Sequence, residues 1–433
     1  MRKILILADD LSGAADCANA CMSSGLSALV SFNEMDHHFE TEVLSIDCDT
    51  RHLSPSEAAA RISRVMQSSH LRPSEWILFK KVDSTLRGNI ASELHTVLAE
   101  RRASSPNRVV AIMAPAFPAG GRTTLDGHQL VHGIPLEKTE IWLRDDLPGV
   151  AHLPSMLGQA GLLTALLSLS IVRNDFANLL SSMMELAAAA DVIVCDAETD
   201  DDLRAIACAS DALGGNTVWV GSAGLAYQLP HAAGLSPFTT SMRQPEFTSG
   251  PTLIVVGSMS SVSHRQARVL EDAIPVTSIR IPADILLEGH SRSALNVLAG
   301  RIYESLKSGN DTLVVLDPNR TVGPGGRRCL TAALRLLLAP YASLVGSLFA
   351  TGGETARAIL EGWGISSLHM LGELEPGLPF SFGRIHDRTL PIITKAGAFG
   401  NQETLVSCWR FFANLSRTSN CAAQGCDITR NFL

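Results

Sequence analysis

The chain has 433 residues, 46% of them hydrophobic, and carries a formal net charge of −8 at pH 7. This length exceeds what most single hydrophobic cores hold, so two domains are expected. The negative balance, without any run of lysines or arginines, disfavours nonspecific binding to nucleic acids or membrane surfaces. The longest apolar stretch, residues 161–172, is too short to span a bilayer.

Cysteine and histidine patterns predict neither a disulfide scaffold nor a metal site. The nine cysteines are scattered, without paired Cys-x-x-Cys spacing, and the thirteen histidines form no His-Glu-x-x-His motif. An odd number of cysteines in a chain of this size favours a reducing compartment, the cytoplasm. The first residues resemble a strand that ends in two acids, rather than a signal peptide with a cleavage site.

The first predicted strand, residues 3–8, is almost entirely apolar, as is typical of a strand buried on both faces. Asp9 and Asp10 follow it directly, before a predicted helix that runs to about Ser24. One of these acids can cap the helix, but capping needs only one of the two. We therefore expect a functional role for Asp10.

The stretch after residue 75 holds the densest group of polar side chains. An apolar run at 76–79 predicts a short buried strand, and Asn89 is expected to cap the helix that follows. A solvated turn with surface ion pairs would explain the polar residues equally well if they are considered alone. The polar side chains between the strand and the helix are Lys80, Lys81, Asp83, Ser84, Thr85 and Arg87.

The position of these residues in a parallel sheet favours a ligand-binding role for them. A further predicted strand, residues 43–47, is followed by Arg51. Parallel α/β sheets bind ligands at the carboxyl ends of their strands. Asp10, Arg51 and Asp83 are therefore expected at one edge of the sheet.

The chemistry of this edge suits an anionic ligand that carries hydroxyl groups. Lys81 and Arg87 suit the anion, because charge-assisted hydrogen bonds to a carboxylate or phosphate are strong. Asp83 can accept a hydrogen bond from a hydroxyl or take its proton, and Ser84 and Thr85 can bond either partner.

A glycine-rich loop follows the next predicted strand, residues 109–113. Residues 114–124 include Gly120, Gly121 and Arg122 but match neither a Walker loop nor a Gly-x-Gly-x-x-Gly motif. This loop by itself therefore does not predict a phosphate site.

Periodicity disappears between residues 231 and 251, where Pro, Ser, Thr, Gly and Gln dominate, and we interpret this change as a linker between domains. Each domain is expected to be α/β, with a mainly parallel sheet flanked by helices. The tail has no assigned role and is expected to be poorly ordered. The expected division is a first domain at 1–235, a linker at 236–251, a second domain at 252–415 and a tail at 416–433.

Three turns that follow predicted strands of the second domain are rich in small residues. They contain Ser258, the pair Gly352 and Gly353, and Gly397. Glycines in such a turn let backbone N–H groups approach a phosphate, and a helix N-terminus favours negative charge. A tight structural turn is the alternative, but it usually needs only one glycine. Together the turns fit one nucleotide lying across a sheet edge.

The motifs of the chain resemble those of the four-carbon acid sugar kinases, in the same order from Asp9 to about Phe411. They are ADDLSGAAD, KKVDSTLRGN, APAFPAGGRTTLDG, GSAGLA, GSMSS, TGGETA, GELEPGLP and ITKAGAFG. The versions GRTTLDG with VHGIPLEKTE, and ITKAGAFG, are most similar to the D-threonate and D-erythronate kinase branch, and the 3-oxo-tetronate kinases are next.

The resemblance implies that the chain phosphorylates the terminal hydroxyl of a four-carbon sugar acid with ATP. D-Threonate is the first choice of substrate, and D-erythronate or a 3-oxo-tetronate is the alternative. The family's substrate-binding residues match Asp10, Arg51, Lys81, Val82, Asp83 and Ser84. Its ATP contacts match Ser258, Gly352, Gly353, Glu354, Thr355 and Gly397.

Both lines of reasoning lead to the same chemistry. Phosphoryl transfer depends mostly on positioning and charge stabilisation. Arg51, Lys81 and Arg87 are candidate clamps for the substrate carboxylate, and Asp10 or Asp83 would orient or deprotonate the attacking hydroxyl. Magnesium is expected on the phosphates as Mg–ATP, while its protein ligands and the oligomeric state stay open.

Two other classes of function compete with a kinase. A non-catalytic sugar-acid sensor would bind one ligand and would not use three small-residue turns in the second domain. An oxidoreductase acting on the same acids is disfavoured, because no predicted strand is followed by Gly-x-Gly-x-x-Gly.

Overall fold

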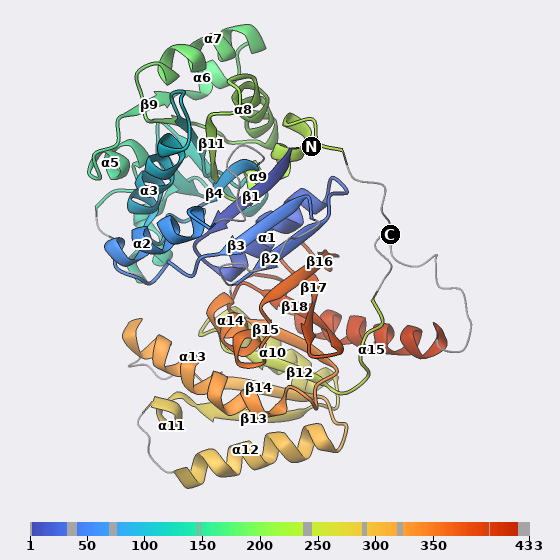
Figure 1. Ribbon diagram of the computed structural model, residues 1–433. Helices are drawn as coiled ribbons and strands as arrows, with labels where there is room; N and C mark the ends of the chain where they lie inside the picture. The colour runs from blue at the N-terminus through green and yellow to red at the C-terminus, as the bar shows by residue number, and fades with distance from the viewer. Residues whose placement is uncertain are drawn as a thin grey trace. The chain divides into compact units, whose positions relative to one another are not determined.

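The computed structural model describes residues 2–32, 41–68, 76–144, 147, 149–236, 245–287, 292–317, 324–397 and 399–422. The chain divides into two compact units, Met1–Thr239 and Thr240–Leu433. Each unit contains a mainly parallel sheet flanked by helices (Figure 1), which confirms the predicted fold class. Residues 237–244 of the predicted linker and 423–433 of the predicted tail lie outside the described residues.

All neighbouring strands in the main sheet of the first unit are parallel. Their order is β2 (Ala28–Ser31), β3 (Val43–Asp47), β1 (Lys3–Ala8), β4 (Trp76–Lys81), β11 (Thr217–Gly221), β5 (Val110–Ala114), β10 (Val192–Cys195) and β9 (Thr164–Leu167). The central strands are buried apolar runs, because helices cover both faces of the sheet. The first and last strands in this order, β2 and β9, were not predicted.

Two groups of helices flank this sheet. One group is α1 (Leu11–Met22), α7 (Phe176–Ala187), α8 (Asp200–Ala212) and α9 (Ala223–Ala232), and the other is α2 (Pro55–Met66), α3 (Ile90–Ala103) and α5 (Leu153–Gly158). The second group joins the sheet in one buried core, in which Ile62, Leu94 and Leu157 accompany Leu5 and Leu7 of β1. The short helices are α4 (Glu140–Arg144), α6 (Leu169–Val172), η1 (Pro118–Gly120) and η2 (Leu136–Lys138).

The predicted glycine-rich loop leads into a small antiparallel sheet that the sequence analysis did not predict. Its strands are β6 (Arg122–Leu125), β7 (His128–Val131) and β8 (Ile134–Pro135). The turn between β6 and β7 is held by the buried Asp196, which accepts hydrogen bonds from the backbone N–H groups of Asp126 and Gly127, each at 2.9 Å.

The sheet of the second unit combines parallel and antiparallel strands. Its order is β13 (Thr277–Pro282), β14 (Thr312–Asp317), β12 (Thr252–Val256), β15 (Ser347–Thr351), β18 (Arg388–Lys395), β17 (Pro379–Ile385) and β16 (Ser367–Glu373). The first five of these strands are parallel, and β17 and β16 extend the sheet in antiparallel fashion.

In the second unit, α10 (Ser261–Ala273) packs with α15 (Thr404–Ala422) over a core that contains Ile254, Leu270 and Phe412. Helix α15 ends at Ala422, so residues 416–422 of the predicted tail are helical. The other helices are α11 (Ala283–Leu287), α12 (Arg292–Lys307), α13 (Pro324–Leu338), η3 (Ala339–Tyr341) and α14 (Gly353–Gly362).

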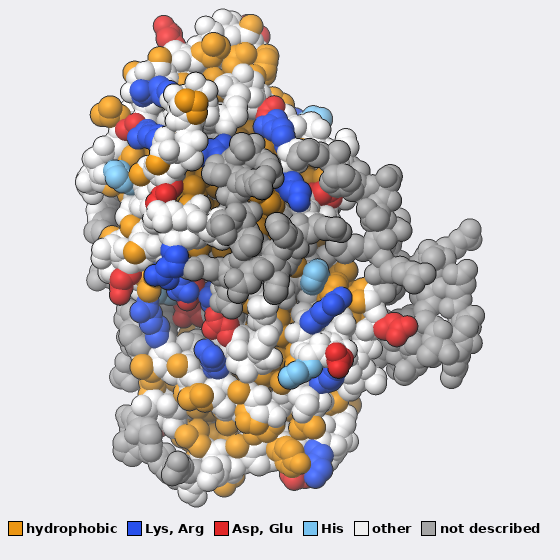
Figure 2. All heavy atoms as spheres, viewed as in Figure 1, with side chains coloured by type: hydrophobic (Ala, Val, Ile, Leu, Met, Phe, Trp, Pro, Cys, Tyr) orange, Lys and Arg blue, Asp and Glu red, His pale blue; other side chains and the backbone are white. Residues whose placement is uncertain are grey.

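The surface carries charges of both signs. Lys and Arg side chains are interspersed with Asp and Glu side chains on the face shown in Figure 2. Within the part of the chain that the structure describes, no helix is both long enough and apolar enough to cross a membrane.

Candidate active site

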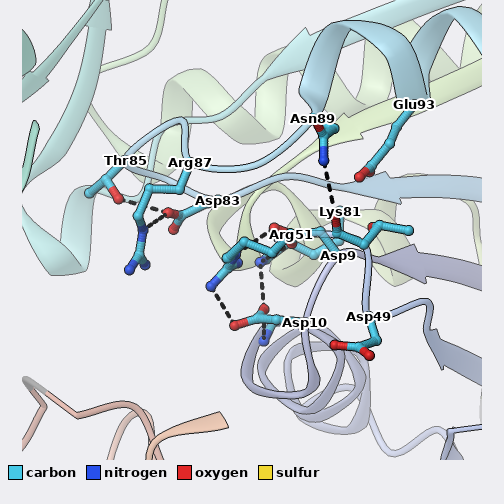
Figure 3. Close-up of polar contacts among 12 residues, drawn as sticks. Asp9, Asp10, Asp49, Arg51, Lys81, Asp83, Thr85, Arg87, Asn89 and Glu93 are labelled. Carbon is cyan, nitrogen blue, oxygen red and sulfur yellow. Dashed lines mark hydrogen bonds and ion pairs between the residues drawn. The ribbon is translucent and has the colours of Figure 1, made fainter. Parts of the chain in front are cut away.

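Three neighbouring parallel strands of the first unit, β1, β3 and β4, end side by side. The register pairs Ala8 with Asp47 and Leu7 with Lys80, so the residues that follow these strands gather at one edge. Figure 3 shows Asp9, Asp10, Arg51, Lys81, Asp83 and Arg87 at this edge. The structure therefore brings together the charged residues that the sequence analysis proposed for the first domain.

Arg51 lies against two acids. Its Nε donates to Asp9 at 2.7 Å and its Nη1 to Asp10 at 2.5 Å (Figure 3). Asp10 also accepts a hydrogen bond from the backbone N–H of Gly13 at 2.9 Å, so the same carboxylate caps α1. Asp9 is only 3% exposed and is the second acid that helix capping left unexplained. Sequence reasoning missed its part in the cluster, although the adjacent pair of acids was the available signal.

The charges in this cluster stabilise one another. Burial raises the pKa of Asp9, but the positive charges of Arg51 and Lys81 outweigh burial and hold that pKa below its usual value. Burial lowers the pKa of Arg51, but Asp10 and Asp9 raise it well above its usual value. Asp9 is therefore ionised, and Arg51 protonated, at neutral pH.

The ammonium group of Lys81 is held between the acids without a hydrogen bond. Its Nζ lies 3.6 Å from an oxygen of Asp9 and 3.7 Å from one of Asp10, and it donates to no residue that the structure describes. Although burial lowers the pKa of Lys81, these two acids raise it above its usual value. Gly13 leaves room for the ammonium, since a Cβ there would lie 1.9 Å from Nζ. Lys81 is thus a charged donor available to a ligand.

Asp83 is held by neighbours in its own loop. Its Oδ2 accepts from the hydroxyl of Thr85 at 2.7 Å and from Nε of Arg87. Burial raises the pKa of Asp83, but Arg87 and Arg51 hold it well below the usual value. An ionised carboxylate with so low a pKa is a weak base, so it suits orienting a hydroxyl better than removing its proton.

The other predicted substrate residues of this loop are Val82 and Ser84. The side chain of Val82 belongs to the buried core, so only its backbone can meet a ligand. Ser84 is half-buried, and its backbone carbonyl accepts a hydrogen bond from Nε2 of Gln129 at 2.9 Å.

The role predicted for Asn89 was wrong. Asn89 stands at the N-cap position of α3, but its side chain does not cap the helix. Its amide instead donates to the backbone carbonyls of Thr50 and Leu53, each at 2.9 Å. The Asn89 side chain thus makes these longer-range contacts instead of capping the helix. The two hydrogen bonds fix the position of the loop that carries Arg51.

Lys80 is turned away from the site into the fold. It forms a buried ion pair with Glu93, with 2.7 Å between Nζ and Oε2. It also donates to the backbone carbonyls of Lys81 at 2.7 Å and Leu7 at 3.3 Å. Lys80 therefore ties together the carboxyl ends of β1 and β4, where the site residues begin.

The three small-residue turns of the second unit follow three adjacent parallel strands, β12, β15 and β18. The register pairs Val256 with Thr351, and Thr351 with Lys395, so the three strands end level with one another. The turns after them therefore lie side by side.

These turns approach one another too closely for larger residues. A Cβ at Gly397 would lie 2.0 Å from Oγ of Ser258, and a Cβ at Gly257 would lie 2.1 Å from Oγ1 of Thr355. Glycine is therefore required at both positions by the packing of the turns.

Helix α14 begins at Gly353. Gly352 stands at the N-cap with a φ of 92°, a left-handed conformation that favours glycine. Glu354 and Thr355 consequently lie in the first turn, where backbone N–H groups have no partner within the helix. This is the arrangement that binds phosphate at helix N-termini.

The sequence analysis missed the lysine that supports the third turn. Lys395 is 1% exposed, and its Nζ donates to the backbone carbonyls of Ala396, Gly397 and Phe399 at 3.1, 3.2 and 2.9 Å. Burial lowers the pKa of Lys395 to about 8. The ammonium gathers these carbonyls around itself and so fixes the conformation of the turn.

In the described ranges, no group of three or more His, Cys, Asp or Glu residues is arranged to hold a metal ion.

Comparison with known families gives the class of the protein. A family model for a sugar-binding N-terminal domain matches residues 4–229, and one for a nucleotide-binding C-terminal domain matches residues 253–405. The chain belongs to the four-carbon acid sugar kinase family, which confirms the predicted family and the predicted enzyme class.

The chain is also similar to individual kinases that are named for particular four-carbon acids. A D-threonate kinase from Cupriavidus necator is 39% identical over 416 residues, which cover 94% of this chain and 97% of the relative. A D-threonate kinase from Salmonella typhimurium is 28% identical, with 93% and 96% covered. A D-erythronate kinase from Heliobacterium modesticaldum is 25% identical, with 97% and 99% covered.

Solved structures share the fold. A protein from Salmonella typhimurium superposes with a TM-score of 0.79 at 19% identity, covering 95% of this chain and 99% of that one. A protein from Haemophilus influenzae gives 0.70 at 21% identity, covering 94% and 100%.

Proposed function

We propose that this kinase transfers the γ-phosphate of ATP to the terminal 4-hydroxyl of D-threonate, giving 4-phospho-D-threonate. The observation that carries the choice of substrate is the 39% identity, over 94% of the chain, with a D-threonate kinase. D-Erythronate and 3-oxo-tetronate are the alternatives, because kinases named for these acids are 25% and 26% identical.

In this proposal the first domain, residues 1–235, binds the sugar acid. Lys81 supports this role, because its buried ammonium makes no hydrogen bond to the described residues and can donate to an anionic ligand. Arg51 and Arg87 add positive charge at the same edge. The ionised Asp83 orients the attacking hydroxyl, and Asp10 is the second candidate for that role.

The second domain, residues 252–415, binds ATP in the proposal. Support comes from the level ends of β12, β15 and β18 and from the N-terminus of α14. The contacts assigned to ATP are Ser258, Gly352, Gly353, Glu354, Thr355 and Gly397. Mg²⁺ is proposed to enter as Mg–ATP and to neutralise charge on the phosphates, with no protein ligand assigned to it.

We also propose a cytoplasmic location and no nucleic-acid or membrane partner. Seven cysteines of the described chain are free thiols, as expected in a reducing compartment: Cys17, Cys21, Cys48, Cys195, Cys208, Cys329 and Cys408. The negative net charge of −8 supports the absence of nucleic-acid binding.

A panel of four-carbon acids tests the proposal. Initial rates with ATP and magnesium are measured for D-threonate, D-erythronate, their L-enantiomers and a 3-oxo-tetronate, and each product is examined by phosphorus NMR. We expect the highest kcat/KM for D-threonate and phosphate on the C4 oxygen. A higher kcat/KM for another acid, or phosphate on another oxygen, would contradict the proposed substrate or position.

A further inference from the structure

One arginine near the substrate loop has no acidic partner among the described residues. Arg51 forms ion pairs with Asp9 and Asp10, and Arg87 forms one with Asp83. Arg122, in contrast, forms no ion pair with any residue described by the structure. Its positive charge is therefore not compensated locally.

The position of Arg122 follows from the small antiparallel sheet. Thr124 pairs with Gln129 across β6 and β7, and residues two apart on a strand share one face. Arg122 thus lies on the face that carries Thr124 and Gln129. That face is joined to the substrate loop, because Oγ1 of Thr124 donates to Gln129 at 2.8 Å and Gln129 donates to the carbonyl of Ser84 at 2.9 Å.

This face is rigidly supported. Gln129 is fully buried, and both ends of its amide are engaged, one by Thr124 and the other by Ser84. The opposite end of the hairpin is fixed by the buried Asp196. The strand that carries Arg122 is therefore braced from both ends.

The guanidinium of Arg122 has a donor that is not used in a hydrogen bond. Its Nη1 donates to the carbonyl of Gly120, but its Nε is buried without a hydrogen-bond partner. Burial lowers the pKa of Arg122, and the charges of Asp83 and Arg87 act on it in opposite directions, which is consistent with their proximity. A buried donor without an acceptor is unfavourable and is expected where a ligand supplies the acceptor.

We propose that Arg122 is a further substrate-binding residue, whose guanidinium binds the carboxylate of the sugar acid. The inference rests on the proposed function, since it needs an anionic four-carbon substrate in the first domain. Among the cations of the site, Arg122 is suited to the carboxylate because its charge is uncompensated and its planar fork matches a carboxylate. It would also explain why the GRTTLDG segment forms a braced hairpin against the substrate loop.

The test uses the full-length chain with Arg122→Ala and Arg122→Lys. We expect Arg122→Ala to raise the KM for D-threonate about ten- to a hundred-fold, the usual effect of losing one charge-assisted contact. The KM for ATP should change little. Arg122→Lys should recover only part of the loss, because it keeps the charge but not the fork.

Arg108→Ala is the matched control. Arg108 also donates to backbone carbonyls, those of Ala187 and Ala190, at 2.8 and 2.9 Å. It precedes Val110, the first residue of β5, and so lies at the amino end of the sheet, away from the site. We expect both KM values of Arg108→Ala to match those of the wild type.

A comparison of a charged with a neutral substrate distinguishes a binding role of Arg122 from a structural one. Wild-type enzyme should prefer D-threonate to its neutral amide, and Arg122→Ala should lose most of this preference. A folded Arg122→Ala variant with wild-type KM and unchanged preference would overturn the inference. If the wild type phosphorylates no four-carbon acid, the proposed function is wrong. The role of Arg122 is then decided by calorimetry, which compares the affinity for D-threonate of the wild type with that of Arg122→Ala.

Discussion

Lys81 and Arg51 meet the same two acids in different ways. Arg51 forms short hydrogen bonds to Asp9 and Asp10, at 2.7 and 2.5 Å, whereas the ammonium of Lys81 stays 3.6 and 3.7 Å from them. Arg51 therefore holds the acids in place, and Lys81 keeps its donors for a ligand. Both side chains supply the positive charge that an anionic substrate requires.

Removing either cation should weaken binding of the sugar acid. We expect Lys81→Ala and Arg51→Ala each to raise the KM for D-threonate, at a cost on the order of 1.5–3 kcal/mol, roughly ten- to a hundred-fold. The KM for ATP should barely change. Steady-state kinetics with each substrate varied in turn measures both values. Weakened ATP binding with intact acid binding would show that the two domains have been assigned in reverse.

Asp9 makes the stability of the chain depend on acid pH. Its pKa in the folded chain lies below the value of about 3.9 expected after unfolding. Such a group contributes stability that is present above the unfolded pKa and is lost as the pH falls toward the folded pKa. We expect the free energy of unfolding to decrease as the pH falls from about 5 to about 1.

Asp9→Asn tests this contribution. The variant should be less stable than the wild type at pH 7, since Arg51 and Lys81 lose an opposite charge, and its stability should depend less on acid pH. Urea unfolding at a series of pH values measures both effects. An equally steep loss of stability in acid for the variant and the wild type would contradict the assignment to Asp9.

The residue types of the site could be predicted from the sequence, but their partners could not. Acids and cations that follow buried strands indicated Asp10, Arg51, Lys81 and Asp83, because parallel strands end at a common edge. Whether Arg51 meets Asp9 or a ligand depends on distances that arise only when the chain folds. Arg122 was visible in a glycine-rich segment, yet its place beside the substrate loop depends on a hairpin that was not predicted.

At the scale of secondary structure, the level ends of β12, β15 and β18 matter most for the nucleotide. Their register brings three turns together that are far apart in the sequence. The apolar runs of these strands were predictable, since parallel strands buried on both faces are continuously apolar. The start of α14 was not, because Gly353 and Thr355 are weak helix formers that are helical here through their tertiary context.

Gly353→Val should block ATP through its side chain while the fold survives. Position 353 is the first residue of α14, where backbone N–H groups face the expected phosphate. Gly300→Val is the matched control, because a Cβ at Gly300 in α12 meets nothing within 4 Å. Calorimetry with ADP compares the two variants. Normal ADP affinity in folded Gly353→Val would rule out this turn as the phosphate site.

Lys395→Met should loosen the third turn. Methionine keeps much of the volume of the side chain but cannot donate to the carbonyls of Ala396, Gly397 and Phe399. We expect faster amide hydrogen exchange in this turn and a higher KM for ATP, with an unchanged KM for D-threonate. Lys307→Met, at the exposed end of α12, is the control. Wild-type exchange rates and ATP kinetics in Lys395→Met would refute the supporting role.

At the scale of the whole molecule, we propose that the two units of the chain divide the reaction between them. The acids and cations that suit a sugar acid lie in the first unit, and the turns that suit phosphates lie in the second. Neither unit carries both sets of residues proposed for the two substrates. Phosphoryl transfer should therefore require both ligands, and a kinase that excludes water from the γ-phosphate should hydrolyse little ATP alone.

The most direct test of this account is the rate of ADP release by the full-length enzyme with Mg–ATP, measured with and without D-threonate. We predict slow ADP release without the acid, a sharp rise when D-threonate is added, and one 4-phospho-D-threonate formed for each additional ADP. Equal ADP release with and without D-threonate, or release without a phosphorylated acid, would contradict it.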